Sequence, residues 1–144
     1  MLAAAFPYRR RMQRVQGIGG VFFRNQGDKD ALIAWYRDHL GIPVTSWGGF
    51  NFRWRDMDGA EDASTTWSVF DADSEYFGRS DQQFMINFRV SDLDAMLAQL
   101  RALGDDVADD VQDTEYGKFG WVTDPQGNRI ELWEPPAGGE PDVD

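Results

Sequence analysis

The 144-residue chain has the length of one domain, and its ten Phe, six Trp and four Tyr supply ample apolar material for a packed core. A formal net charge of −11 argues against binding to nucleic acid, because phosphates are held by Lys and Arg. The lack of cysteine excludes disulfides, thiolate catalysis and Cys-ligated zinc. No apolar run approaches the roughly 20 residues that span a bilayer, and nothing marks export, so we expect a cytoplasmic protein without a membrane partner.

The two ends of the chain differ in composition from its middle. An apolar stretch at 2–6 precedes four arginines between positions 9 and 14, which is the reverse of the order in a secretory signal. We therefore expect a basic N-terminal extension over residues 1–16, and a start of translation at Met12 stays open. Residues 136–144 are rich in Gly, Pro and acidic residues, and we expect an acidic tail there.

The first half indicates a strand, a helix and three further strands. Alternation at 21–24 predicts the first strand, and a helix follows from about Asp28 to Leu40. Asp28 or Asp30 suits its N-cap, while Gly41 and Pro43 end it. The apolar side of this helix consists of Ala31, Leu32, Trp35, Tyr36 and Leu40. Strand-like patterns then occupy residues 44–47, 50–54 and 65–70.

The second half repeats this plan. A strand at 84–90 leads into a helix at 91–103, which Ser91 caps and Gly104 ends, and three strands follow at 107–111, 119–123 and 129–134. Repetition of a whole supersecondary unit is a strong fold signal. We expect a single domain over residues 17–135, with module one at 17–71, a polar linker at 72–82 and module two at 83–135.

The predicted strands have one apolar face and one mixed face. Each module has a single helix, which covers only one face of its sheet, and charged residues on the other face need partners. Two sheets curved around a shared half-polar interior satisfy this need and form a cup that holds a ligand. The ligand-binding candidates that face this cup are Phe22, Arg24, Trp54, Trp67, Met85, Asn87, Arg89, Trp121, Glu131 and Trp133.

The segment 124–135 carries the strongest local signal. Pro125 and Gly127 suit a β-turn, and the alternation after the turn places Glu131 mid-strand on the cup side. Two interpretations of this carboxylate stay open. It acts as a metal ligand or general base, or it pairs with Arg89 or Arg129 on the same face.

The chain resembles the vicinal oxygen chelate superfamily, which includes glyoxalase I, bleomycin-resistance proteins and extradiol dioxygenases. The resemblance rests on the paired β-α-β-β-β modules, on AWYRDHLG at 34–41 and on DPQGNRIEL at 124–132. It implies an α+β fold with a cup-shaped mixed sheet, and a divalent metal bound by His or Gln in each first strand and Glu in each last strand. These positions fall on Gly20 and Met85, near Trp67 and Ser68, and on Glu131, so only Glu131 matches a ligand.

Two functions follow from this resemblance. The first is a protein that binds a small organic ligand in an aromatic cup without the usual metal triad, and for it no cofactor is predicted. The second is a metal-dependent lyase or dioxygenase of the same superfamily that uses Glu131 as one ligand. Whether the chain is an enzyme stays open between them, and the resemblance also implies a homodimer.

Overall fold

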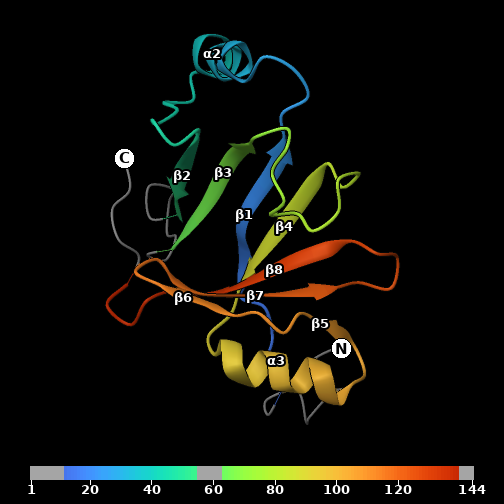
Figure 1. The fold of residues 1–144 in the computed structure, drawn as a ribbon. Coiled ribbons are helices and arrows are strands. Elements are labelled where there is room, and N and C mark those ends of the chain that lie inside the picture. The colour runs from blue at the N-terminus through green and yellow to red at the C-terminus, as the bar shows by residue number, and fades with distance from the viewer. Residues whose placement is uncertain (1–11, 55–62, 140–144) are drawn as a thin grey trace, which may run out of the picture.

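The computed structural model describes residues 12–54 and 63–139 (Figure 1). Its elements, in chain order, are β1 (Gly17–Arg24), α2 (Lys29–Leu40), β2 (Gly49–Arg53), β3 (Ser64–Phe70), β4 (Phe84–Arg89), α3 (Leu93–Ala102), β5 (Asp106–Val107), β6 (Gln112–Thr114), β7 (Gly117–Thr123) and β8 (Arg129–Glu134). Most of the expected N-terminal extension and the end of the expected acidic tail lie outside the described residues.

All the strands join one mixed sheet. Seven of them follow the order β2-β3-β1-β4-β8-β7-β5, and β6 pairs with β7. Within each module the first and last strands are parallel, and antiparallel pairing of β1 with β4 joins the two modules. The sheet twists so strongly that β7 and β8 run steeply across the direction of β1 and β4 (Figure 1). The expected α+β class with a curved mixed sheet is confirmed.

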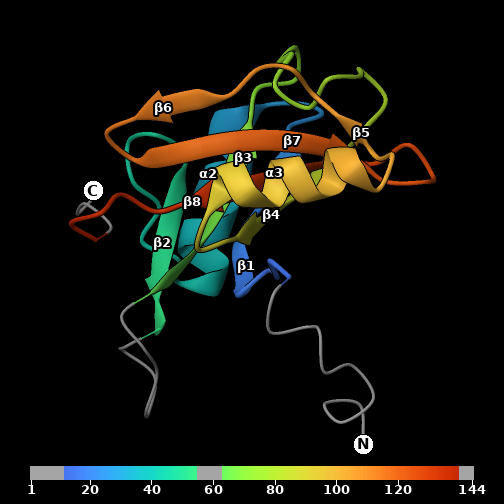
Figure 2. The same cartoon turned by 90° about the horizontal axis from the view of Figure 1, so that it is seen from below.

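Helix α3 covers the outer face of module two. Its residues Leu93, Met96 and Leu97 are buried against one face of the sheet, together with Val122 and Leu132. Figure 2 shows the helix lying along the second module's strands. The N-cap is Asp92 and not Ser91, because the Asp92 carboxylate accepts a hydrogen bond from the Ala95 N–H at 3.0 Å. The predicted apolar face of module two is thus correct, and its buried core is here.

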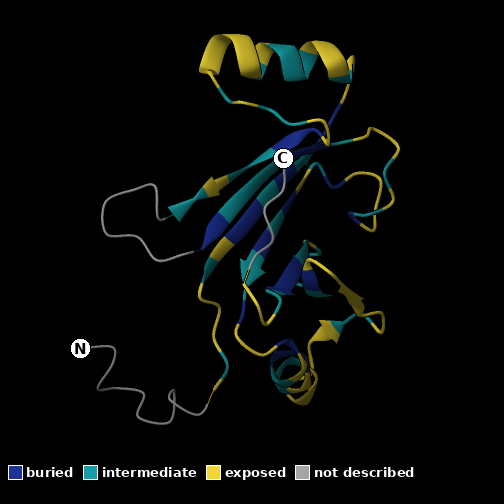
Figure 3. Cartoon of the chain, turned by 90° about the vertical axis from the view of Figure 1, so that its left-hand side faces the viewer, coloured by how far each residue is buried: buried dark blue, intermediate teal, exposed yellow. Residues whose placement is uncertain are grey.

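Helix α2 begins and ends where the sequence predicts, but its apolar side is not buried against the sheet. Asp28 caps it, and Gly41 ends it with φ of +70°. None of its residues is buried, and Figure 3 shows it standing apart from the sheet in yellow and teal. Among the described residues, Tyr36 is the one of this helix whose ring packs on the sheet, 4.8 Å from the ring of Trp67. Trp35 and Leu40, predicted to pack, are 45% and 58% exposed.

Two expected strands have a different structure. Residues 44–47 do not form a strand. The chain turns at Ser46 and Trp47, and the Thr45 N–H donates to the Gly49 carbonyl across this turn instead of to a neighbouring strand. Module one is therefore β-α-β-β. Residues 107–111 are interrupted at Asp109 and Asp110, which leave the two-residue β5 on one side and the separate strand β6 on the other.

The chain joins the domain before β1 begins. Gln13 and Gln99 exchange two hydrogen bonds, and the Gln16 N–H donates to the Arg89 carbonyl at 2.8 Å. In the described part of the chain, no helix is long and apolar enough to cross a membrane.

Candidate functional site

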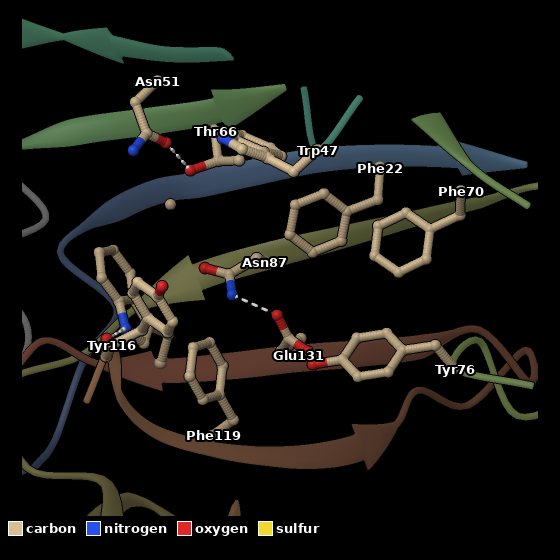
Figure 4. Close-up of a pocket in the computed structure, with 12 residues that line it drawn as sticks. Phe22, Trp47, Asn51, Thr66, Phe70, Tyr76, Asn87, Tyr116, Phe119 and Glu131 are labelled. Atoms are coloured by element: carbon tan, nitrogen blue, oxygen red, sulfur yellow. Dashed lines mark hydrogen bonds between the residues drawn. The ribbon is translucent and has the colours of Figure 1, made fainter. Parts of the chain in front are cut away.

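A cavity of about 400 Å³ opens on the face of the sheet opposite the two helices, and we call it the cup. This volume lies in the range that holds a small organic molecule. Figure 4 shows its side chains converging from both modules and from the loop between them. The lining residues are Gly19, Phe22, Trp47, Asn51, Thr66, Phe70, Tyr76, Asn87, Tyr116, Phe119, Glu131 and Trp133.

One row of paired residues crosses the floor of the cup. The strand register places Thr66 opposite Gly20, Gly20 opposite Asn87, and Asn87 opposite Glu131. These four positions come from the first and last strands of the two modules, as do the metal ligands that the resemblance implies. Asn87 lies two residues after Met85 on the same face of β4, and it is Asn87 that the register pairs with Glu131. In β3 the register pairs Gly20 with Thr66, one residue before Trp67.

Glu131 lies at the centre of this row and is 1% exposed. Its Oε1 accepts a hydrogen bond from Asn87 Nδ2 at 2.7 Å, and its Oε2 accepts one from Trp121 Nε1 at 3.0 Å. The Tyr76 hydroxyl also donates to Oε2. All three donors are neutral side chains. Arg129 acts on this carboxylate through its charge, which lowers the pKa of Glu131 against the larger effect of burial, and its guanidinium carbon lies 5.0 Å from the Trp121 ring centroid.

Burial governs the protonation of this cluster. Desolvation raises the pKa of Glu131, and the hydrogen bonds from Tyr76, Asn87 and Trp121 oppose that rise. Burial also raises the pKa of Tyr76, and the neighbouring charge of Glu131 adds to the effect. Tyr76 therefore stays protonated and acts as a hydrogen-bond donor to the carboxylate.

Asn87, which lines the cup, has a buried acceptor oxygen without a hydrogen-bond partner. The side chain is 3% exposed, its Nδ2 is committed to Glu131, and its Oδ1 has no hydrogen-bond partner. Figure 4 shows this oxygen turned away from Glu131, toward Tyr116. A Cβ atom on Gly19 would lie only 2.2 Å from this Oδ1, so a glycine is needed to leave the amide its space. The unpaired oxygen is a fixed polar atom at the wall of a largely aromatic cavity.

The loop between the modules, residues 71–83, closes one end of the cup. It brings in Tyr76 and Phe77, and Phe77 is fully buried beside Phe22 and Trp121. Arg24 anchors this loop from β1. Its guanidinium donates to four loop carbonyls, those of Ala72, Ser74, Arg79 and Gln82, at 2.6–3.3 Å. Arg24, predicted to face a ligand, is thus buried as a positioning residue for the loop.

The other predicted ligand-binding residues occupy three kinds of place. Phe22 and Trp133 line the cup. Met85 and Trp121 lie beneath its floor, each at most 2% exposed. Trp67 and Trp54 do not line the cup and lie on the other side of the sheet of module one.

The Trp67 ring packs on Phe23 and Tyr36, on the side of α2. Trp54 donates to the hydroxyl of Thr65, which lies on the opposite face of β3 from Thr66. Arg89 lies near the Trp133 ring, with its guanidinium carbon 5.7 Å from the centroid, and its Nε donates to Gln16.

Several cup residues are not among the predicted ligand-binding residues. Tyr76 lies in a segment assigned as a polar linker, where two adjacent aromatic residues among acidic ones were the available signal. Trp47 lies in a turn that was assigned as a strand, and it reaches the cup from there. Phe119 and Tyr116 come from the glycine-flanked hairpin of β6 and β7.

The cup residues do not fit a divalent metal. Gly20 has no side chain, and the Thr66 hydroxyl donates to Asn51. Both oxygens of Glu131 already accept hydrogen bonds, so a cation would have to displace N–H and O–H donors that point at the same lone pairs. Across residues 12–54 and 63–139, no group of three or more His, Asp or Glu side chains is placed to hold a metal ion.

Comparisons with known proteins agree with this architecture. No curated protein matches the sequence. Among solved structures, methylmalonyl-CoA epimerase from Mycobacterium tuberculosis is 23% identical, with a TM-score of 0.59 over 86% of this chain and 91% of that one. A variant methylmalonyl-CoA epimerase from Streptomyces coelicolor, in complex with 2-nitronate-propionyl-CoA, is 18% identical, with a TM-score of 0.63 over 86% and 100% of the two chains.

A glyoxalase/bleomycin resistance protein/dioxygenase superfamily member from Vibrio splendidus 12B01 is 13% identical, with a TM-score of 0.50 over 85% and 99% of the chains. At these identities the likeness concerns the fold alone. The sequence comparison goes further, because residues 21–133 match the family model described as a glyoxalase-like domain. The chain therefore belongs to the glyoxalase-like domain family, within the vicinal oxygen chelate superfamily.

Proposed function

We propose that this protein binds a small organic molecule in the cup without the help of a metal ion. One observation carries the proposal: the side chain at the single surviving ligand position, Glu131, is fully engaged by three neutral donors. In this role Glu131 is a polar part of the cavity floor that fixes Tyr76 and Asn87. The aromatic walls supply the binding energy by burying apolar ligand surface.

The alternative function, a metal-dependent lyase or dioxygenase, gains little support from the residues at the implied ligand positions, since only Glu131 among them carries a carboxylate or an imidazole. The epimerase structures named above include a complex with a CoA derivative. A chain with a net charge of −11 is a poor partner for the phosphates of such a molecule. We therefore favour a ligand without phosphate groups.

Binding at the cup is tested with 2-naphthol, a two-ring aromatic probe, titrated calorimetrically into protein that has been dialysed against a chelator. The proposal expects one site per chain. Thr66→Phe adds a ring inside the cup and should abolish binding, whereas Ala98→Phe adds a ring on the exposed side of α3 and should not. Absence of binding to the wild-type protein, or equal binding by both variants, would refute the proposal.

We also propose the homodimer that the resemblance implies. Its support is exposed apolar surface. Trp35 and Leu40 in α2 of module one are 45% and 58% exposed, and Phe84 in β4 of module two is 58% exposed. Sedimentation equilibrium should show a dimer, and Trp35→Glu with Leu40→Glu should convert it to a monomer. A wild-type monomer at micromolar concentration would contradict this proposal.

A further inference from the structure

In the buried part of the cup, four side chains have hydrogen-bond donors that already have acceptors within the protein. The Tyr76 hydroxyl and Asn87 Nδ2 donate to Glu131, and the Thr66 hydroxyl donates to Asn51. Trp133 Nε1 donates to the Tyr116 carbonyl at 2.8 Å. The donors of these four side chains are therefore committed within the protein.

One acceptor in the cup, Asn87 Oδ1, has no donor partner. Asn87 Oδ1 is buried, lacks a partner, and cannot exchange places with Nδ2 without turning a lone pair toward the Glu131 carboxylate. A buried carbonyl oxygen that stays unpaired costs stability, and a ligand that donates a hydrogen bond removes this cost. A ligand that offers only acceptors gains nothing at this point.

The walls restrict the shape of the ligand. Seven aromatic side chains line the cavity, and those of Phe22, Phe70, Phe119 and Trp133 come from strands of both modules. Phe119 and Trp133 are nearly parallel, with an interplanar angle of 17° and ring centroids 6.4 Å apart. Flat aromatic walls favour a flat aromatic ligand, because stacked and edge-on contacts then cover both of its faces.

From these observations we propose that the ligand class is a planar, uncharged aromatic or heteroaromatic molecule with an N–H or O–H group that donates to Asn87 Oδ1. This inference rests on the proposed function and refines it. Two features disfavour a negatively charged ligand. The cup contains the buried carboxylate of Glu131, and the chain has a net charge of −11. Asn87 is then the residue that selects donors over acceptors.

A matched pair of probes tests this selection. Indole and benzothiophene have the same two-ring shape, but only indole carries an N–H donor. Calorimetric titration should give indole an affinity at least about tenfold higher than that of benzothiophene, the size expected when a buried polar group is left unpaired. In Asn87→Ser, which lacks the amide oxygen, this preference should fall below about twofold, a change of about 1 kcal/mol. Asn128→Ser makes the same substitution in an exposed turn and should keep the preference.

The outcomes separate the two proposals. Equal affinity of native protein for indole and benzothiophene overturns the donor inference but leaves cup binding intact, and this comparison needs no variant to fold. Persistence of the preference in Asn87→Ser assigns the selection to another residue and also overturns the inference. Failure of both probes and of 2-naphthol to bind refutes the proposed function itself.

Discussion

Two replacements of Glu131 separate the effect of its charge from that of its hydrogen bonds. Gln removes the charge and keeps an acceptor, whereas Leu removes both. In Glu131→Gln the new side chain keeps an oxygen that accepts from Tyr76 and Trp121, and its amide group donates to Asn87 once the Asn87 side chain turns over. Tyr76 and Trp121 keep their acceptor, the turned Asn87 amide has one unpaired group as it does in the native protein, and a buried charge is removed. We expect the free energy of unfolding at pH 7 to stay within about 1 kcal/mol of the wild-type value, or to rise.

The Glu131→Leu variant keeps nearly the same side-chain volume, but its new side chain accepts no hydrogen bond. It leaves three buried donors unpaired, at about 1–3 kcal/mol each. Since such losses are not additive, we expect a total cost of about 3–5 kcal/mol. Urea denaturation followed by tryptophan fluorescence measures both variants. If Glu131→Leu costs less than about 1 kcal/mol, the three hydrogen bonds do not hold the cup floor together.

The pH dependence gives an independent check on the same residue. Because burial raises the pKa of Glu131 in the folded state above its ordinary value of 4.5, its protonated form favours folding. That contribution is complete below the ordinary pKa and is lost as the pH rises through the folded pKa. Relative to Glu131→Gln, the wild-type protein should therefore lose stability as the pH is raised from about 4 toward neutrality. If the difference in unfolding free energy between the wild-type protein and Glu131→Gln does not change with pH, burial does not raise the pKa of Glu131.

Three further substitutions probe the parts that position the cup. Arg24→Met should lower the free energy of unfolding by about 2–4 kcal/mol in urea denaturation, because four loop carbonyls lose their donors. A loss below about 0.5 kcal/mol, as for an exposed residue, would show that Arg24 does not anchor the loop. Leu97→Ala should cost about 2–5 kcal/mol in the same assay, and a negligible loss would refute the buried face of α3. Asp124→Ala should destabilise the protein at pH 7, since hydrogen bonds from Asn128 hold the pKa of Asp124 below its ordinary value of 3.8. Its stability contribution is lost as the pH falls through that lowered pKa, so the gap to Asp124→Ala should close in acid, and a gap independent of pH would contradict this.

Local sequence signals predicted the elements that depend on neighbours in the chain. The turn before β8 is an example: Asp124 accepts from the N–H groups of Gln126 and Asn128, and Gly127 has φ of +88°. Alternation after this turn placed Glu131 on the cup side correctly. The capping and end of α2 were equally predictable from Asp28 and Gly41.

Features that depend on distant pairing could not be found in the same way. The row that joins Thr66, Gly20, Asn87 and Glu131 follows from strand register, which depends on pairing between distant parts of the chain. Tyr76 meets Glu131 across 55 positions, and nothing near it in the chain indicates this contact. The apolar side of α2 is visible in the sequence, but periodicity does not reveal whether another surface covers it.

The metal content of purified, tag-free protein tests the central claim most directly. The account predicts far less than one equivalent of any divalent metal by mass spectrometry, and binding of 2-naphthol that stays the same after chelation or after added Mn²⁺, Ni²⁺ or Zn²⁺. Near-stoichiometric metal that disappears in Glu131→Gln would contradict it, because the carboxylate would then be a ligand and not a hydrogen-bonded part of the cup floor.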